Sequence, residues 1–289
     1  MTEKRMAKIQ VGDLAISVSD VGSGPPVVLL HGLACGKRMW FHQIRALRKH
    51  FRVIACDLRG HGETDAPSVA TEYSAAHLTR DLLGMLDALN IERAALVGFS
   101  LGGGPALAVA ATRPERVSRL VLADVGAGAD EPLKIEWMTR RWLALIRQGE
   151  VDELVADMLR SEFYKVHARR SARCRAHMAA LIRATPLDGL RFTLSEVLAK
   201  RKSLFRTTGV LKHLRVPTLV MVGQHDYVCS KAARLLAETI PNARLKIIAN
   251  SGHMSPLEQP AAFSAALMEF FGERRLAGSD EGYDTPPSA

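Results

Sequence analysis

Runs of apolar residues alternate along most of the chain with stretches in which apolar residues recur at helical spacing. The first two runs, at 8–11 and 14–20, predict a hairpin that turns at Gly12 and Asp13. Six continuous apolar runs, typical of strands buried on both faces, follow at 26–30, 52–56, 94–98, 118–123, 216–222 and 243–248. Helical patterns between them cover 38–49, 74–89, 101–113, 229–240 and 260–272. This alternation predicts an α/β domain with a mostly parallel, eight-stranded sheet flanked by helices.

Residues 128–212 break the alternation, because they contain three or four amphipathic helical stretches and no clear buried strand. Apolar side chains recur there at helical spacing, including Trp137, Met138, Trp142, Leu145 and Ile146. We expect this segment to form a helical lid inserted into a core made of residues 1–127 and 213–272. Residues 273–289 are rich in Gly, Pro, Ser and acidic residues, which predicts a disordered tail.

A short motif stands between the apolar run at 94–97 and the helical run that follows it. Residues 98–102 read Gly-Phe-Ser-Leu-Gly, the strand–turn–helix arrangement of a nucleophile elbow. Glycines on both sides allow the backbone to turn tightly and expose the hydroxyl of Ser100. We expect Gly103 and Gly104 to let the helix pack closely behind the turn. The motif predicts that Ser100 is a catalytic nucleophile.

A serine hydroxyl needs a neighbouring base to become nucleophilic at neutral pH. His253 follows the last predicted strand, and Asp226 follows the strand at 216–222. The order nucleophile, acid, histidine is the one used by hydrolases with this elbow. His253 is therefore the predicted base, and Asp226 the acid that orients it. Asp124 also ends a strand and is the alternative acid, although a cap for the turn into the lid is the favoured interpretation. His225 precedes Asp226 on the same loop and is poorly placed to act as the base.

The oxyanion of an acyl-transfer reaction needs two hydrogen-bond donors that are already in position. The N–H of Leu101, directly after the nucleophile, is one candidate, and the N–H of Leu33, after the strand at 26–30, is the other. His31 is expected to brace this loop. The reaction needs no metal and no organic cofactor. Four aromatic residues of the lid are candidates for contacting the substrate, although their spacing fits plain packing equally well: Trp137, Trp142, Phe163 and Tyr164.

These motifs together resemble the α/β-hydrolase superfamily over about residues 8–272. The matching features are His31-Gly32, the turn at 57–62, the elbow, the segment 112–116, Asp226 and His253. The resemblance implies a helical lid over the site and the same three catalytic roles. It also implies that the turn at 57–62, with Arg59 and His61, is structural. It does not imply one substrate.

Within the superfamily, serine at position 100 argues against the haloalkane dehalogenase and epoxide hydrolase branches, which use a carboxylate nucleophile. The chain is most similar to enol-lactonases, arylesterases and haloperoxidase-like esterases, whose Gly-His-x-x-x-x-Glu-x-Pro pattern is present at residues 252–260. Meta-cleavage C–C hydrolases are near relatives, but they usually carry Trp after the catalytic histidine, where this chain has Met254.

We therefore expect hydrolysis of a small carboxylic ester or lactone through an acyl-enzyme intermediate. The alternatives on the same scaffold are a C–C bond hydrolase of the meta-cleavage type and an acyltransferase or perhydrolase, in which another nucleophile replaces water. A ligand receptor with slow turnover is the non-enzymatic alternative.

The net charge of +9 is concentrated in one segment. Residues 166–212 contain 11 Lys/Arg and 2 Asp/Glu, whereas the rest of the chain carries 28 of each sign. One hypothesis is that this basic segment attracts an anionic substrate, and the alternative is a solvated basic face. Aromatic residues are not interleaved with the cations, so a nucleic-acid partner is not expected.

Four cysteines, Cys35, Cys56, Cys174 and Cys229, show neither metal-ligand spacing nor a disulfide framework. Reduced thiols in the cytoplasm are the expected state. No apolar stretch reaches about 18 residues, so we expect no membrane span. Residues 1–10 lack the apolar region of a secretory signal.

Overall fold

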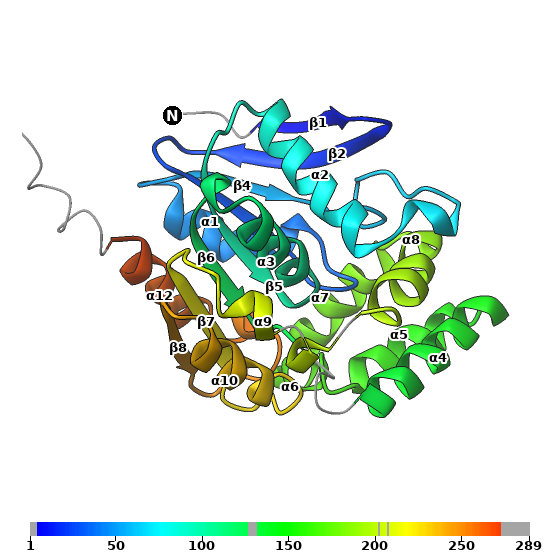
Figure 1. Ribbon diagram of the computed structural model, residues 1–289. Helices are drawn as coiled ribbons and strands as arrows, with labels where there is room; N and C mark the ends of the chain where they lie inside the picture. Colours follow the sequence, from blue (N-terminus) through cyan, green and yellow to red (C-terminus); the bar gives the residue numbers. More distant parts are fainter. Residues whose placement is uncertain (1–4, 127–131, 202, 207, 273–289) are drawn as a thin grey trace, which may run out of the picture.

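The protein folds around one eight-stranded sheet in a computed structural model, which describes residues 5–126, 132–201, 203–206 and 208–272 (Figure 1). The strand order is β1-β2-β4-β3-β5-β6-β7-β8. Strands β1 and β2 form the predicted hairpin, and β2 also pairs antiparallel with β4, whereas all remaining pairs are parallel. The prediction of a mostly parallel, eight-stranded sheet is therefore confirmed. The strand bounds are β1 Arg5–Val11, β2 Leu14–Val21, β3 Pro26–Leu30, β4 Arg52–Cys56, β5 Ala94–Phe99, β6 Val117–Ala123, β7 Thr218–Gly223 and β8 Ala243–Ile248.

Alternate side chains of the central strands enter two separate apolar cores. On β3, Val27 and Leu29 belong to one core, and Val28 and Leu30 belong to the other. Both sides of each central strand are covered, which explains why its sequence is continuously apolar. Side chains of α1 (Phe41–Leu47) and α12 (Pro260–Gly272) fill the first core. Side chains of α2 (Ala75–Ala88), α3 (Gly103–Thr112) and α10 (Ser230–Thr239) fill the second.

A group of helices is inserted between β6 and β7, and most of them lie together beside one end of the sheet, whereas the last, α9, contacts α10 of the core (Figure 1). Trp142 and Met158 are completely buried among these helices. A π-helical turn at Thr193–Leu198 follows the fifth of them. The inserted helices, more numerous than the sequence pattern suggested, are α4 Pro132–Gln148, α5 Val151–Arg160, α6 Lys165–Arg170, α7 Ala172–Arg183, α8 Leu187–Phe192 and α9 Thr208–Leu211.

Two parts of the predicted domain organisation lie outside the described residues. They are the start of the insertion, at 127–131, and the tail at 273–289. Within the described ranges, no helix combines the length and the apolar character that a membrane crossing requires.

The packing of α3 against the sheet depends on one of the two glycines that the sequence singled out. A Cβ atom at Gly103 would lie 2.3 Å from Cγ2 of Val125, so the close approach of this helix requires glycine there. A Cβ atom at Gly104 would meet nothing within 4 Å. The expectation that both glycines allow close packing is therefore wrong for Gly104, because its α-carbon faces open space.

We expect opposite effects from the same substitution at these two neighbouring positions. Gly103→Ala forces Val125 out of place and should lower the free energy of unfolding by about 1–3 kcal/mol. Gly104→Ala adds only helix propensity and should raise it by about 0.5 kcal/mol. Urea unfolding of the two variants measures the difference. Equal stability of the two variants would contradict this description of the packing.

Candidate active site

Ser100 lies on a tight turn between β5 and α3, as the first residue of a 3₁₀ turn that spans Ser100–Gly102. Its φ is +49°, a left-handed conformation that costs a non-glycine residue about 1–2 kcal/mol. The turn is tight enough that a Cβ atom at Gly98 would lie 2.6 Å from the carbonyl oxygen of Gly102. A Cβ atom at Gly32 would lie 2.7 Å from the ring of Phe99. Side chains are therefore excluded on both sides, and the serine hydroxyl lines an open pocket.

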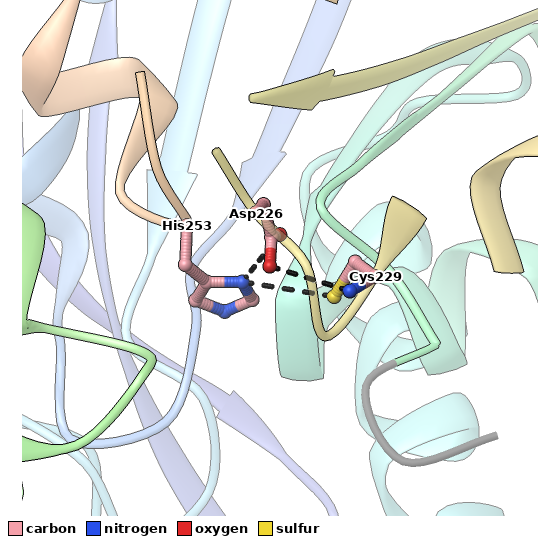
Figure 2. Close-up of side chains that lie close together, drawn as sticks. All are labelled: Asp226, Cys229 and His253. Carbon is pink, nitrogen blue, oxygen red and sulfur yellow. Dashed lines mark hydrogen bonds and ion pairs between the residues drawn. The ribbon is translucent and has the colours of Figure 1, made fainter. Parts of the chain in front are cut away.

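A buried histidine and a buried carboxylate complete a hydrogen-bonded chain with this hydroxyl. Nε2 of His253 lies 3.0 Å from Oγ of Ser100, and Nδ1 of His253 lies 2.8 Å from Oδ2 of Asp226. Figure 2 shows the carboxylate of Asp226 pointing at the imidazole ring. If Nδ1 carries the proton and donates to the carboxylate, Nε2 is left to accept the proton of the serine hydroxyl. This arrangement can transfer a proton away from Ser100.

The environment of Asp226 favours its ionised form. Burial opposes ionisation, but the charge of His253 and hydrogen bonds from His253, Asp124 and Cys229 together lower the pKa of Asp226 below its ordinary value. The backbone N–H of Cys229 also donates to Oδ1 of Asp226 at 3.3 Å. An anionic Asp226 is the state that can orient a neutral imidazole and stabilise it once it is protonated.

Cys229 lies directly beside this pair, which its place in the sequence did not indicate. Its Sγ lies 3.6 Å from Nδ1 of His253 (Figure 2). The same Sγ donates to the backbone oxygen of Asp124 at 3.2 Å. Burial raises the pKa of the Cys229 thiol, so the sulfur stays protonated. Asp226, Cys229 and His253 offer three possible metal ligands within 4.8 Å of one another. Zinc would need a thiolate and the Nδ1 atom already bonded to Asp226, so the contacts favour a hydrogen-bonded cluster.

Asp124, the alternative acid, directly follows β6 and is completely buried. Its Oδ1 accepts from the backbone N–H of Gly223 at 2.8 Å, and its Oδ2 accepts from the hydroxyl of Ser255. These bonds join the residue after β6 to the end of β7 and to Ser255, after β8. The turn into the inserted helices, which Asp124 was expected to cap, includes residues 127–131, outside the described residues. The carboxylate bonded to Nδ1 of His253 belongs to Asp226.

Both candidate oxyanion donors border the same pocket. Leu33 and Leu101 line it, and the N–H of Leu101 lies in the first turn of a helical segment, where backbone donors have no intrahelical acceptor. The two loops are tied together, because the N–H of Gly102 donates to the carbonyl oxygen of His31 at 3.0 Å. The hydroxyl of Tyr164 donates to the carbonyl oxygen of Leu33 at 2.8 Å, so the inserted helices contact this loop directly.

The lining of the pocket is mostly apolar and separates the four aromatic candidates into two groups. Phe163 and Tyr164 line the pocket, and the ring of Phe163 packs 4.8 Å from that of His253, centre to centre. Trp142 lies in the interior of the inserted helices instead, where its Nε1 donates to Asp157 at 2.9 Å. Trp137 is 66% exposed and borders a neighbouring cleft. Helical spacing alone could not separate these positions.

The basic segment meets the pocket at Arg201. This residue lines the pocket together with Ser100 and His253. Four arginines are exposed on two helices, Arg169 and Arg170 on α6 and Arg173 and Arg175 on α7. Several other cations of the segment form ion pairs on the surface, namely Arg183 with Asp152, Arg191 with Asp188 and Lys200 with Glu196.

Glu258 supports the loop that carries His253. It is buried, and its Oε2 accepts from the backbone N–H of Gly252 at 2.5 Å and from the hydroxyl of Ser251 at 3.2 Å. The sequence had singled out this glutamate through the Gly-His-x-x-x-x-Glu-x-Pro pattern at residues 252–260. The carboxylate therefore fixes the backbone directly before the histidine.

The loop after β3 is supported by two buried, neutral histidines. Nδ1 of His31 bonds to the carbonyl oxygen of Gly32 at 2.8 Å, and its Nε2 accepts from the N–H of Leu58 at 2.8 Å. The ring of His61 lies 5.1 Å from that of His31, centre to centre. Burial, and to a smaller extent the neighbouring His31, lower the pKa of His61 to about 3. His31 cannot take a proton on Nε2 without losing the bond from Leu58, and a proton on Nε2 of His61 would be buried without a hydrogen-bond partner.

Comparisons with known proteins identify the family to which this chain is similar. The family model described as alpha/beta hydrolase fold matches residues 25–260. The 2-hydroxymuconate semialdehyde hydrolase of a Pseudomonas species is 31% identical over 278 residues, which cover 93% of this chain and 95% of that protein. A hydrolase from Pseudomonas aeruginosa has a similar structure, with a TM-score of 0.82 at 30% identity, covering 92% of this chain and 98% of the other. The enol-lactonase from Burkholderia xenovorans has a TM-score of 0.80 at 27% identity, covering 92% and 99%.

We expect His61 to make the fold sensitive to acid. Because its pKa is about 3 in the folded state, the unfolded chain alone binds this proton as the pH falls below about 6.5. The contribution of His61 to the free energy of unfolding is therefore fully present above pH 6.5 and is lost as the pH falls toward 3. Between about pH 7.5 and pH 5, the free energy of unfolding of the wild-type protein should fall by about 2 kcal/mol more than that of His61→Asn.

Urea unfolding at the two pH values measures this loss. Asparagine at position 61 can still donate to the carbonyl oxygen of Arg59, which now bonds to Nδ1 of His61 at 3.1 Å. His213→Asn, at an exposed histidine, is the matched control and should follow the wild-type protein. Parallel losses in the wild-type protein and His61→Asn would show that this ring is not responsible.

Proposed function

The chain belongs to the alpha/beta hydrolase fold family of enzymes, and we propose that it is a serine hydrolase that cleaves a small carboxylic ester or lactone. The observation that carries this proposal is the continuous hydrogen-bonded chain from Ser100 through His253 to Asp226, with distances of 3.0 and 2.8 Å. A serine hydroxyl, a neutral imidazole and a buried carboxylate in this order generate a nucleophile at neutral pH.

The proposed reaction has two halves that use the same groups. Oγ of Ser100 attacks the carbonyl carbon while Nε2 of His253 takes its proton, and the N–H groups of Leu33 and Leu101 stabilise the oxyanion. His253 then gives the proton to the leaving oxygen, which leaves an acyl group on Ser100. Water, activated by His253, releases the acid and restores the serine. Asp226 stays ionised throughout.

We assign substrate selection to residues 128–212 as a lid over this site. Two contacts support this role, the hydrogen bond from Tyr164 to Leu33 and the packing of Phe163 on His253. Both residues lie on the inserted helical segment, and both touch loops of the core that carry the reaction. On this division, residues 1–127 and 213–272 supply the chemistry, and the lid shapes the pocket.

The lining of the pocket favours a substrate with an apolar body and one negative charge. Ile135, Met138 and Leu198 supply apolar surface, and Arg201 supplies a cation. A guanidinium beside an apolar pocket binds a carboxylate with charge-assisted hydrogen bonds. An ester or lactone that carries a carboxylate therefore fits better than a neutral one.

A second candidate function is C–C bond hydrolysis. The 31% identical relative is named as a hydrolase of 2-hydroxymuconate semialdehyde, and a serine nucleophile with the same oxyanion donors can serve that reaction. Comparing kcat/KM for matched aryl esters, lactones and a dienoate ring-cleavage product separates the two. Turnover of the dienoate alone would replace the ester assignment.

We expect Ser100→Ala to lower kcat/KM for a short nitrophenyl ester by at least about a thousand-fold, because the nucleophile is lost while the fold is kept. His253→Ala should cause a similar loss. A fluorophosphonate probe should label the wild-type protein at Ser100 and leave Ser100→Ala unlabelled. Near-normal esterase activity in Ser100→Ala would overturn the assignment.

Replacing the cation of the pocket tests the substrate charge. Arg201→Met should lower kcat/KM about ten-fold or more for an ester that carries a carboxylate, because a charged hydrogen bond is lost. The kcat/KM for the neutral isostere of that ester should change little. Arg173→Met, on the exposed face of the basic segment, is the matched control and should leave kcat/KM unchanged for both esters. Equal effects of Arg201→Met on both esters would exclude recognition of the charge.

A further inference from the structure

Two carboxyl groups are buried next to each other behind the imidazole of His253, and the proposed reaction uses one of them. Asp124 is completely buried and Asp226 is 2% exposed, and Cys229 contacts both residues, because its thiol donates to the backbone oxygen of Asp124 and its N–H donates to Oδ1 of Asp226. They come from neighbouring parallel strands, because Asp124 directly follows β6 and Asp226 follows β7 by three residues. If the two carboxyl groups form a direct hydrogen bond, one of them must carry a proton.

Among the residues that the structure describes, few positively charged groups face this pair. The groups facing it are His253, the protonated thiol of Cys229 and the hydroxyl of Ser255, with Arg201 exerting a weaker influence through Cys229. Two negative charges held close together in a protein interior repel each other much more strongly than they would in water. One proton held by the pair removes this repulsion.

The hydrogen bonds decide which carboxyl keeps the proton. Asp226 accepts from Nδ1 of His253 and from the N–H of Cys229, so its anion has two donors and faces the base. Asp124 accepts from the backbone N–H of Gly223 at 2.8 Å and from the hydroxyl of Ser255, and this hydroxyl can turn and accept instead when Asp124 is protonated. Burial, and next the charge of Asp226, raise the pKa of Asp124 well above its ordinary value.

We propose that Asp124 is protonated at neutral pH and donates a hydrogen bond to Asp226, so that one shared negative charge faces His253. Asp124 is then a positioning residue. It holds the acid of the triad ionised, spreads its charge over two carboxyl groups, and links β6 to the loops that carry Asp226 and His253. The inference rests on the proposed triad of Ser100, His253 and Asp226 for its effect on catalysis.

The side chain of asparagine reproduces the proposed state of Asp124. Its carbonyl oxygen can accept from Gly223, and its amide can donate to Asp226 and to Ser255. Asp124→Asn therefore replaces one neutral donor with another, whereas Asp124→Ala leaves Asp226 without this donor and the N–H of Gly223 without this acceptor. We expect Asp124→Ala to lose about ten- to a hundred-fold in kcat, and Asp124→Asn to recover most of that loss.

Infrared difference spectroscopy observes the proton directly. The carbonyl stretch of a protonated carboxyl should be present in the wild-type protein at neutral pH and absent in Asp124→Asn. The exposed carboxylate of Asp87 provides the matched control, and Asp87→Asn should keep the band. The band should persist from about pH 5 to pH 8, where ordinary aspartates are ionised. Absence of the band from the wild-type protein overturns the proposal, and this reading holds even if Asp124→Asn does not fold.

The pH profile of kcat/KM gives a second, independent readout. If Asp124 is neutral, Asp124→Asn removes no charge, and the acid limb of the profile stays where it is in the wild-type protein. If Asp124 is an anion, the substitution removes a negative charge beside His253, and the limb moves down by about one pH unit. Such a shift overturns the proposal.

Failure of the proposed triad can be distinguished from failure of this proposal. Because the infrared band does not depend on turnover, an active Ser100→Ala would refute the triad while leaving the protonation of Asp124 to be judged by the band alone.

Discussion

The strained turn at Ser100 is the constraint on which the rest of the site depends. A φ of +49° is unfavourable for serine, and it persists because β5, α3 and the loop after β3 pack so tightly around the turn that another path is blocked. Similar strain occurs at the ends of neighbouring strands. Among described non-glycine residues with positive φ, Ala34, Asp124 and Asn250 lie in the loops after β3, β6 and β8. The stability of the sheet therefore holds several loops in unfavourable conformations at the edge where the reacting groups meet.

Burial of the polar groups around the turn controls their charge. His61 has a pKa of about 3, the thiol of Cys229 stays protonated, and the hydroxyl of Tyr164 has a raised pKa, in each case with burial as the largest cause. Such an interior accommodates little net charge, because each buried ion must be solvated by protein dipoles. Asp226 is ionised in this environment because four hydrogen bonds or charges favour its anion. A second anion at Asp124 would lack comparable support, and this imbalance is the physical basis for the shared proton.

Much of the fold could be predicted because its determinants are local in the sequence. Val27 and Val28 enter different cores, so the strand reads as continuously apolar, and the same holds for the other central strands. Ser100, Asp226 and His253 could be singled out because each lies at or shortly after the carboxyl end of a predicted strand. The choice between Asp124 and Asp226 could not be made by position, since both follow strands. It depends on which loop reaches Nδ1 of the imidazole.

Contacts between segments that are distant in the sequence could not be predicted from the local pattern of residues. Cys229 lies beside His253 because the first turn of α10 passes behind the imidazole, and Arg201 reaches the pocket at the end of a long helical insertion. Trp137 and Trp142 both belong to the helically spaced apolar positions of α4, yet Trp137 is exposed and Trp142 is buried. The face of a helix that becomes buried is set by its partner, which periodicity alone does not identify.

The contacts of the inserted segment connect the proposed lid to the proposed reaction. Tyr164 donates to the carbonyl oxygen of Leu33, and the N–H of Leu33 is one of the proposed oxyanion donors. Its neighbour Phe163 packs against the ring of His253. On the proposed roles, a substrate that displaces these two aromatic side chains changes the position of the proposed oxyanion donor and of the proposed base together. The proposed lid then affects kcat as well as KM, because binding energy from the distant part of the substrate is used to align the groups that react.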